Sequence, residues 1–173
     1  MREDVAHHMT GKPTFESIVT AHGPTVLRVC RSVVAAVDAE DAWSDTFLAA
    51  MRAYPELPPD ANVEAWLVTI AHRKAIDITR RTARRATPMA APPETASAPA
   101  TDRFDDEDLV NALRHLPPKQ RQAVAYHYLG GLPYADVADI IGGNTAAVRR
   151  AAADGISSLR RTFRGAAPEG NSK

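Results

Sequence analysis

The sequence predicts an all-α protein made of two small helical domains joined by a flexible linker. The chain of 173 residues holds 32 alanines and 9 glycines, and alanine is the best helix former. Apolar residues recur at helical spacing on both sides of residue 90. Between these two parts, residues 86–104 contain six alanines and four prolines but few large apolar side chains. Such a composition cannot build a core and is typical of a linker.

These features predict five segments along the chain. A flexible N-terminus, 1–13, precedes a helical domain over 14–85. The linker, 86–104, would span roughly 25 Å as a random coil. A second helical domain is expected over 105–165, followed by a flexible tail over 166–173.

The N-terminal domain is expected to contain three helices. Helical spacing runs over 15–33, where Pro24 should interrupt or kink the helix. The second helix is predicted to start near Asp38, whose charge suits a helix N-terminus. Prolines predict a loop over 54–60, and Asn62 is a good N-cap for the third helix.

The third helix carries two different faces. One face is apolar and includes Val63, Leu67, Ile70, Ala71 and Ile78. Because each residue of an α-helix is rotated by 100° about the axis from the one before, a second, cationic stripe lies next to the apolar face. It consists of Arg73, Arg80 and Arg84.

The C-terminal domain is expected to contain four helices, over about 105–115, 118–129, 133–141 and 145–163. The last two helices are joined by the residues Gly142, Gly143 and Asn144. A glycine that ends one helix and an asparagine that caps the next are typical of a helix-turn-helix.

The last of these helices has an apolar stripe and an opposite face of small residues and arginines. The stripe consists of Val148, Ala152, Gly155, Ile156, Leu159 and Phe163. The opposite face consists of Ala146, Arg149, Arg150, Ala153 and Ser157. Small residues with arginines suit a helix that enters a DNA groove and reaches phosphates or guanine edges.

The net charge of zero hides a strong alternation. The charged residues within 38–64 and within 102–108 are mostly acidic, whereas those within 73–85 and within 149–164 are mostly basic. A uniformly basic nucleic-acid coat is excluded, and two separate basic blocks predict two contacts with a polyanion.

Several other classes of protein are excluded or disfavoured. We find neither an apolar signal segment nor an apolar run long enough to cross a membrane, so we expect a cytoplasmic protein with no membrane contact. Cys30 is the one cysteine, and we expect it in the core rather than as a nucleophile. No histidine has ligands at metal spacing, and no phosphate loop or catalytic triad pattern occurs. We therefore expect no metal, no cofactor and no catalytic residue.

Four stretches occur in order along the chain: DAED at 38–41 with TFL at 46–48; WL at 66–67 with IA at 70–71, Asp77 and RR at 80–81; LPPKQR at 116–121; and GLPYADVADIIG at 131–142. These stretches and their order resemble regions 2 and 4 of the sigma-70 family of bacterial RNA polymerase sigma factors, in the extracytoplasmic-function group. The resemblance implies a subunit that directs core RNA polymerase to promoters and helps to open them.

The resemblance also implies roles for the N-terminal domain. The helix 38–52 would dock on the β′ clamp helices of core RNA polymerase, through Asp38, Asp41, Ser44, Asp45 and Leu48. The loop at 54–62 would capture a flipped base of the −10 element, and the third helix would hold the melted strand. The residues implied at the −10 element are Asp60, Asn62, Arg73, Arg80, Arg81 and Arg84.

For the C-terminal domain, the resemblance implies that the last helix reads the −35 element. The implied residues are Asn144, Thr145, Ala146, Arg149, Arg150 and Ala153. The β flap of core polymerase and an anti-sigma factor are further implied partners. The chain departs from the family pattern at Ser44, Arg73, Ala146-Ala147, Arg149-Arg150-Ala151 and Asp154.

Two alternatives stay open at this point. One is a stand-alone helix-turn-helix regulator, usually a dimer on a palindrome, that needs no core polymerase. Separate acidic and basic surfaces on the N-terminal domain argue against it. The other is a small hydrolase, which the missing catalytic pattern disfavours.

Overall fold

A computed structural model describes residues 12–85 and 106–165. Within these two ranges the chain forms helices and short connecting turns, with no β-strand. The predicted linker and both predicted flexible ends fall almost entirely outside the described residues.

The first helix, α1, spans Phe15–Val33 and starts at a side-chain cap, where Thr14 Oγ1 accepts from the backbone N–H of Ser17 at 3.3 Å. Of the two outcomes predicted for Pro24, an interruption or a kink, the interruption is wrong, because the helix continues through this residue. A proline inside a helix costs about 3 kcal/mol. Buried side chains on both sides of it, such as Ile18 and Val26, offset that cost by packing.

After a 3₁₀ turn at Ala36–Asp38, helix α2 spans Ala39–Ala53. A second 3₁₀ turn at Tyr54–Glu56 opens the predicted loop. Helix α3 spans Val63–Arg85, and Asn62 Oδ1 accepts from Ala65 N–H at 3.1 Å, as its predicted N-cap role requires.

The C-terminal helices are α4 (Asp106–Arg114), α5 (Pro118–Val124), α6 (Tyr134–Ile141) and α7 (Thr145–Gly165). Between α5 and α6, Ala125–Leu129 form a π-helical turn, η3, in place of the α-helix predicted to reach residue 129. Helices α5 and α7 pack closely, because Gly155 brings α7 against Val124 and Gln120 of α5.

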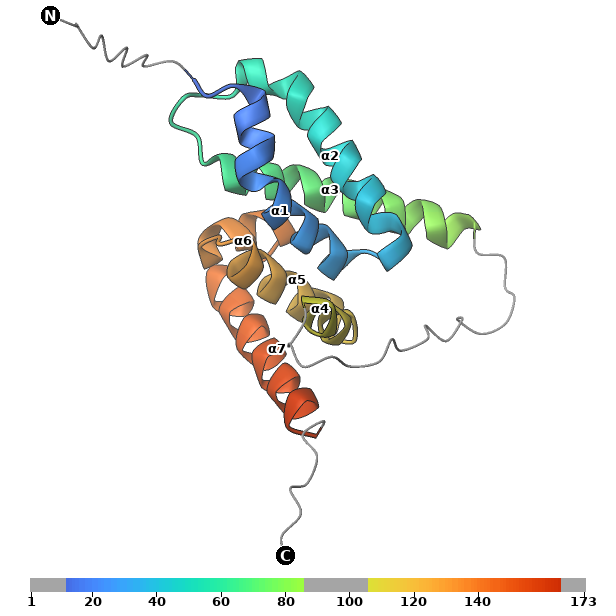
Figure 1. Cartoon of the computed structure of the whole chain (residues 1–173). Coiled ribbons are helices and arrows are strands. Elements are labelled where there is room, and N and C mark those ends of the chain that lie inside the picture. Colours follow the sequence, from blue (N-terminus) through green and yellow to red (C-terminus); the bar gives the residue numbers. More distant parts are fainter. Residues whose placement is uncertain (1–11, 86–105, 166–173) are drawn as a thin grey trace, which may run out of the picture.

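The two halves of the chain pack against each other. Helix α1 lies between the α2–α3 pair and the C-terminal helices (Figure 1), and it contacts α4, α5 and η3, while α3 contacts α6. One hydrophobic cluster contains buried residues of both halves, among them Val29 and Leu67 together with Ala123, Tyr126 and Val137. The sequence did not predict this shared core.

Candidate nucleic-acid interface

The helix-turn-helix has the geometry that its sequence predicts. Gly142 and Gly143 have φ of 77° and 126°, a range that favours glycine, and so α6 can end sharply. Asn144 Oδ1 then accepts from the backbone N–H of Ala147 at 2.8 Å and caps the start of α7. The turn therefore fixes the angle at which α7 is presented.

The predicted reading face of α7 lies at the surface. We define the α7 surface by its six predicted contact residues: Asn144, Thr145, Ala146, Arg149, Arg150 and Ala153. Thr145 is half-buried and the other five are exposed. On the other side of the helix, Val148, Ala152, Gly155 and Leu159 are buried. The predicted division of α7 into two faces is confirmed.

Arg149 lies on an aromatic support. Its guanidinium carbon is 5.4 Å from the ring centre of Tyr134, a cation–π contact. Tyr134 stacks on His127 with ring centres 3.8 Å apart. Its hydroxyl is 3.4 Å from that of Tyr128, and this hydrogen bond is the main cause that raises the Tyr134 pKa. Sequence reasoning missed these three aromatic residues. Only the fold shows that they lie together beside an arginine of α7.

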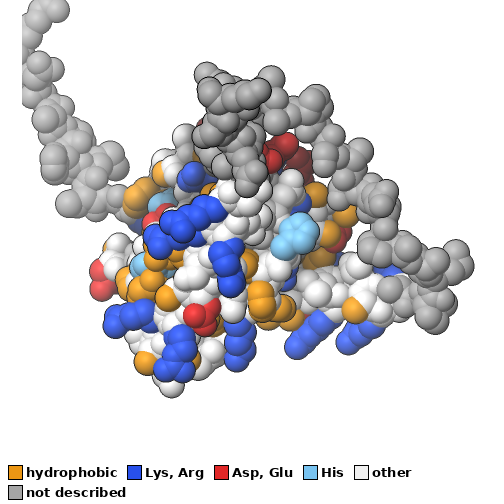
Figure 2. Space-filling model, turned by 90° about the horizontal axis from the view of Figure 1, so that it is seen from below, with side chains coloured by type: hydrophobic (Ala, Val, Ile, Leu, Met, Phe, Trp, Pro, Cys, Tyr) orange, Lys and Arg blue, Asp and Glu red, His pale blue; other side chains and the backbone are white. Residues whose placement is uncertain are grey.

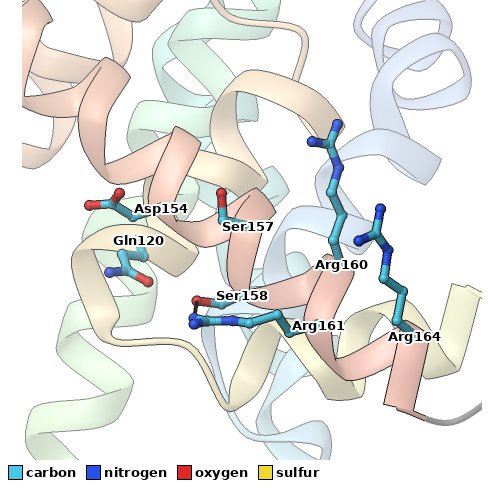
Figure 3. Close-up of a pocket in the computed structure, with 7 residues that line it drawn as sticks. All are labelled: Gln120, Asp154, Ser157, Ser158, Arg160, Arg161 and Arg164. Carbon is cyan, nitrogen blue, oxygen red and sulfur yellow. Dashed lines mark hydrogen bonds between the residues drawn. The ribbon is translucent and has the colours of Figure 1, made fainter.

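The far end of α7 carries a basic hollow of about 590 Å³. It is lined by Gln120, Asp154, Ser157, Ser158, Arg160, Arg161 and Arg164. Arg161 reaches back and donates to Ser158 Oγ at 3.0 Å, while Arg160 and Arg164 extend away on the other side (Figure 3). Seen from the end where α7 terminates, Lys and Arg side chains are spread over much of the surface (Figure 2). No nucleophile–base pair occurs among these lining residues, and the hollow suits anion contact rather than catalysis.

We define the α3 surface by the residues predicted at the −10 element: Asp60, Asn62, Arg73, Arg80, Arg81 and Arg84. All six are exposed. From Arg73 to Arg84 the stripe extends about 16 Å along the helix, at 1.5 Å per residue. Lys12 donates to the backbone carbonyl of Leu57 at 2.7 Å and to that of Tyr54, so the loop before Asp60 is tied to the start of α1. Lys12 was not among the predicted site residues.

We define the α2 surface by Asp38, Asp41, Ser44, Asp45 and Leu48, which are exposed or half-buried. The first four line a groove with Ile78, Arg81, Thr82 and Arg85 of α3. Arg81 Nη2 lies 3.9 Å from Asp45 Oδ2. The acidic and basic surfaces expected on this half therefore adjoin along one edge, because α2 and α3 pack side by side.

Exposed apolar side chains extend the α2 surface. Leu48 and Met51 are each 50% exposed and lie on one side of the helix, and Val37 is 84% exposed in the turn before it. Sequence reasoning selected Leu48 but missed Met51 and Val37. Exposed apolar side chains beside charged ones mark protein-interaction surfaces.

The buried titratable groups take no part in a reaction site. Burial raises the pKa of Cys30 to about 12, so its thiol is not a nucleophile at neutral pH. In the described part of the chain, no group of three potential metal ligands comes together. Within those same ranges, no helix is long and apolar enough to span a bilayer.

Comparison with known proteins agrees with this geometry. The family model "Sigma-70 region 2" matches residues 18–85, and "Sigma-70, region 4" matches residues 106–159. The RNA polymerase sigma factor CarQ of Myxococcus xanthus is 31% identical over 153 residues, which cover 84% of this chain and 87% of CarQ. The chain belongs to the sigma-70 family, in the extracytoplasmic-function group.

Other sigma factors are similar at lower identity. The ECF sigma factor SigK of Mycolicibacterium vanbaalenii is 29% identical over 131 residues, covering 70% of this chain and 67% of SigK. The sigma factor RpoE of Bartonella quintana, solved with the anti-sigma factor NepR, has a TM-score of 0.73 at 22% identity and covers 87% of this chain and 96% of its own. CnrH, solved with the cytosolic domain of CnrY, has a TM-score of 0.64 at 22% identity and covers 88% and 89%. These two structures share the fold.

The sigma factor assignment divides the molecule at the undescribed segment 86–105. Region 2 comprises α1, α2 and α3, and region 4 comprises α4 to α7. The protein is therefore a transcription initiation factor that directs core RNA polymerase to promoters, and not an enzyme. It acts by binding, with core polymerase and promoter DNA as its partners.

Proposed function

We propose that this sigma factor divides its contacts among the α2, α3 and α7 surfaces. The α2 surface docks on the β′ clamp helices of core RNA polymerase. Its support is the combination of carboxylates on the first turns with the half-exposed Leu48 and Met51 further along the helix. A charged rim beside an apolar centre is the usual composition of a protein interface.

The α3 surface holds the melted −10 element. A cationic stripe with exposed arginines can follow the phosphates of one strand. The loop at 54–62 captures an unstacked base beside it, and Lys12 fixes this loop by its bonds to Tyr54 and Leu57. Arg81 must leave Asp45 to reach DNA, which costs little because exposed ion pairs contribute about 0–1 kcal/mol.

The α7 surface enters the major groove at the −35 element. Arg150 points away from the buried stripe, and we assign it a base edge. We assign Arg149 a phosphate, since its guanidinium is already drawn towards Tyr134 at the rim of the helix. The segment 86–104 connects the two DNA contacts along core polymerase, and region 4 also meets the β flap.

An anti-sigma factor is a further partner in this proposal. The solved relatives RpoE and CnrH are bound to NepR and to the cytosolic domain of CnrY, respectively. Because core RNA polymerase acts in the cytoplasm, this protein acts there too.

The observation that carries the proposal is that every predicted contact residue lies at or near the surface, on three different elements. The α2 contact can be tested with a matched pair of charge reversals. Asp41→Lys and Glu40→Lys change the same charge in the first turn of α2, at neighbouring exposed positions about 100° apart around the helix. Both variants place a positive charge near the N-terminus of α2, so the helix dipole destabilises them to the same extent.

We expect Asp41→Lys to weaken binding to core polymerase by about tenfold or more, because like charges then meet at the interface. Glu40→Lys should bind nearly as the unmodified protein does. The measurement is a fluorescence titration with purified core enzyme, with far-UV circular dichroism as the folding control. Equal affinities for the two variants would contradict docking through the α2 surface.

A further inference from the structure

The distal half of α7 carries three arginines to which the contacts described above assign no role. These distal arginines, Arg160, Arg161 and Arg164, are all exposed. They line the hollow of about 590 Å³, together with the hydroxyl groups of Ser157 and Ser158. The hollow therefore presents cations and hydrogen-bond donors to an anion that enters it.

Neither the helix dipole nor ion pairing accounts for the distal arginines. The dipole favours cations in the last turn of a helix, and only Arg164 lies in the last turn of α7. Among the described residues, no carboxylate forms an ion pair with any of the three. Arg160 and Arg164 extend to the same side of the helix, one turn apart, where their like charges repel each other (Figure 3). Unpaired like charges destabilise the free helix, and an anionic partner would compensate for this cost.

The distal arginines share one face of α7 with the residues proposed to read DNA. At about 100° per residue counted from Thr145, the part of the α7 surface from Ala146 to Ala153 covers about 40° to 140° around the helix. The distal arginines cover about 60° to 160°. The buried stripe lies on the other side, at about 280° to 340°. One exposed face is thus continuous along almost the whole helix.

The length of α7 carries this face beyond the bases that the helix can read. Helix α7 is unbroken over Thr145–Gly165 (Figure 1). In a helix-turn-helix, the N-terminal residues of the second helix contact the bases. From Arg150 to Arg160 the helix rises about 15 Å, or about four base pairs at 3.4 Å each. Because the groove winds around the duplex and the helix does not, the distal half lies over the bordering strand, where phosphates are exposed.

The reading part of α7 has few side chains that can identify a base. Ala146 and Ala153 carry no hydrogen-bonding group, so Arg149 and Arg150 are the long polar side chains on this part of the face. Phosphate contacts supply much of the affinity of proteins for DNA. Cations next to such a surface therefore strengthen binding without adding selectivity.

We propose that Arg160, Arg161 and Arg164 bind phosphates of duplex DNA beside the −35 element, on the side towards which α7 runs. The contact is independent of sequence and extends about four to six base pairs beyond the bases that Arg150 reaches. It rests on the proposed −35 contact and adds a site which that contact does not include. An acidic protein surface is the other partner of matching charge, but the face shared with the reading residues favours DNA.

Duplexes of different length test this contact. One duplex carries only the −35 element of a promoter that the protein transcribes, and two others extend it by about eight base pairs of arbitrary sequence, each on one side. We expect the full chain to bind one extended duplex roughly tenfold more tightly than the short duplex at low salt. The other extended duplex should bind about as the short one does. Equal binding to all three duplexes would overturn the proposal.

Removal of the distal arginines should abolish the gain from the extended duplex. With Arg160→Ala, Arg161→Ala and Arg164→Ala combined, the slope of log affinity against log salt should fall by about one per arginine. Lysine at the same three positions should keep most of the slope, since a phosphate contact requires the charge. Arg52→Ala removes an exposed arginine of α2 and should change neither quantity. An unchanged slope in the triple alanine variant, with its helical content intact by circular dichroism, would also overturn the proposal.

Two other results have separate meanings. If the triple alanine variant binds every duplex normally but lowers run-off transcription with core polymerase, the distal arginines bind a protein, and the DNA contact is overturned. Failure of the proposed −35 contact would instead appear as unchanged binding of Arg150→Ala to the short duplex. That result does not depend on the distal arginines.

Discussion

Gly155 is a residue whose role depends on its neighbour across a helix contact. A Cβ at this position would lie 2.7 Å from Val124 Cγ2 and 3.4 Å from the carbonyl oxygen of Gln120. By helix propensity alone, Gly155→Ala should stabilise α7 by about 1 kcal/mol. Because valine is stiff and the backbone cannot yield, we expect instead a net loss of about 1–3 kcal/mol from overpacking.

Chemical denaturation followed by circular dichroism measures this loss. Gly165→Ala is the control on the same helix, since nothing lies within 4 Å of a Cβ at Gly165. A stabilised Gly155→Ala variant would show that α5 and α7 do not pack as closely as described.

Arg149 and Arg150 can be told apart by salt dependence. If Arg150 contacts a base edge, Arg150→Ala should lose about 1–3 kcal/mol and relax selectivity at one base pair. If Arg149 contacts a phosphate, Arg149→Ala should weaken binding to all sequences alike and lower the salt slope by about one. Binding of the full chain to −35 duplexes over a salt series measures both effects, with Arg52→Ala of α2 as the control. Unchanged affinity in both variants would remove α7 as the reading helix.

His72 makes stability depend on pH. Its Nδ1 forms a hydrogen bond of 2.8 Å with the hydroxyl of Tyr126 in η3. The groups around this bond are Arg73 on α3, and Cys30 and Arg121, which lie near Tyr126. Because the folded pKa of His72 lies below its ordinary value of 6.5, the unfolded state binds the proton more readily. The stability that neutral His72 supports is complete above about pH 6.5 and falls as the pH drops below that value, by at most about 1.4 kcal/mol per pH unit.

Thermal unfolding at pH 7.5 and pH 5.5 tests this dependence. His72→Asn keeps a polar group near the Nδ1 position but does not titrate, so the variant should lose less stability between the two pH values. The other histidines remain in both proteins and contribute equally. An identical loss in both proteins would contradict a buried, neutral His72.

At the scale of elements, the sequence predicted the positions of the helices well. It did not predict the local changes that tertiary packing imposes on them. The caps at Asn62 and Asn144 and the two faces of α7 follow from local chemistry, and local chemistry is readable from sequence. Pro24 misled because tertiary packing of α1 outweighs the local preference to break. The π-helical turn has no local signal, because it arises where Tyr126 is drawn into region 2.

The candidate surfaces were likewise predictable from the sequence only in part. Charge and spacing selected the arginines of α7, whose exposure is confirmed. They could not select Tyr134 or Lys12, which matter through contacts with residues distant in sequence. Nor could they predict that Arg81 lies beside Asp45, since that pairing depends on the packing of α2 on α3.

At the scale of the whole molecule, cleavage within segment 86–104 tests whether the two domains stay together when no peptide chain connects them. Its composition predicts preferential proteolysis there, leaving two resistant fragments. Because region 2 and region 4 share a core, we expect the fragments to elute together on gel filtration, and those of Tyr126→Phe, which lacks the bond to His72, to separate more readily. Cleavage spread evenly over the chain would contradict the two-domain organisation.

The central claim is that two domains of one chain read two promoter elements through core RNA polymerase. The most direct test is run-off transcription with purified core enzyme on a genomic promoter library, followed by replacement of either element in a selected promoter. The account predicts specific transcripts only with core enzyme and this protein together, and their loss when either element is replaced. Site-specific DNA binding by the protein alone, with no transcript from core enzyme, would contradict it.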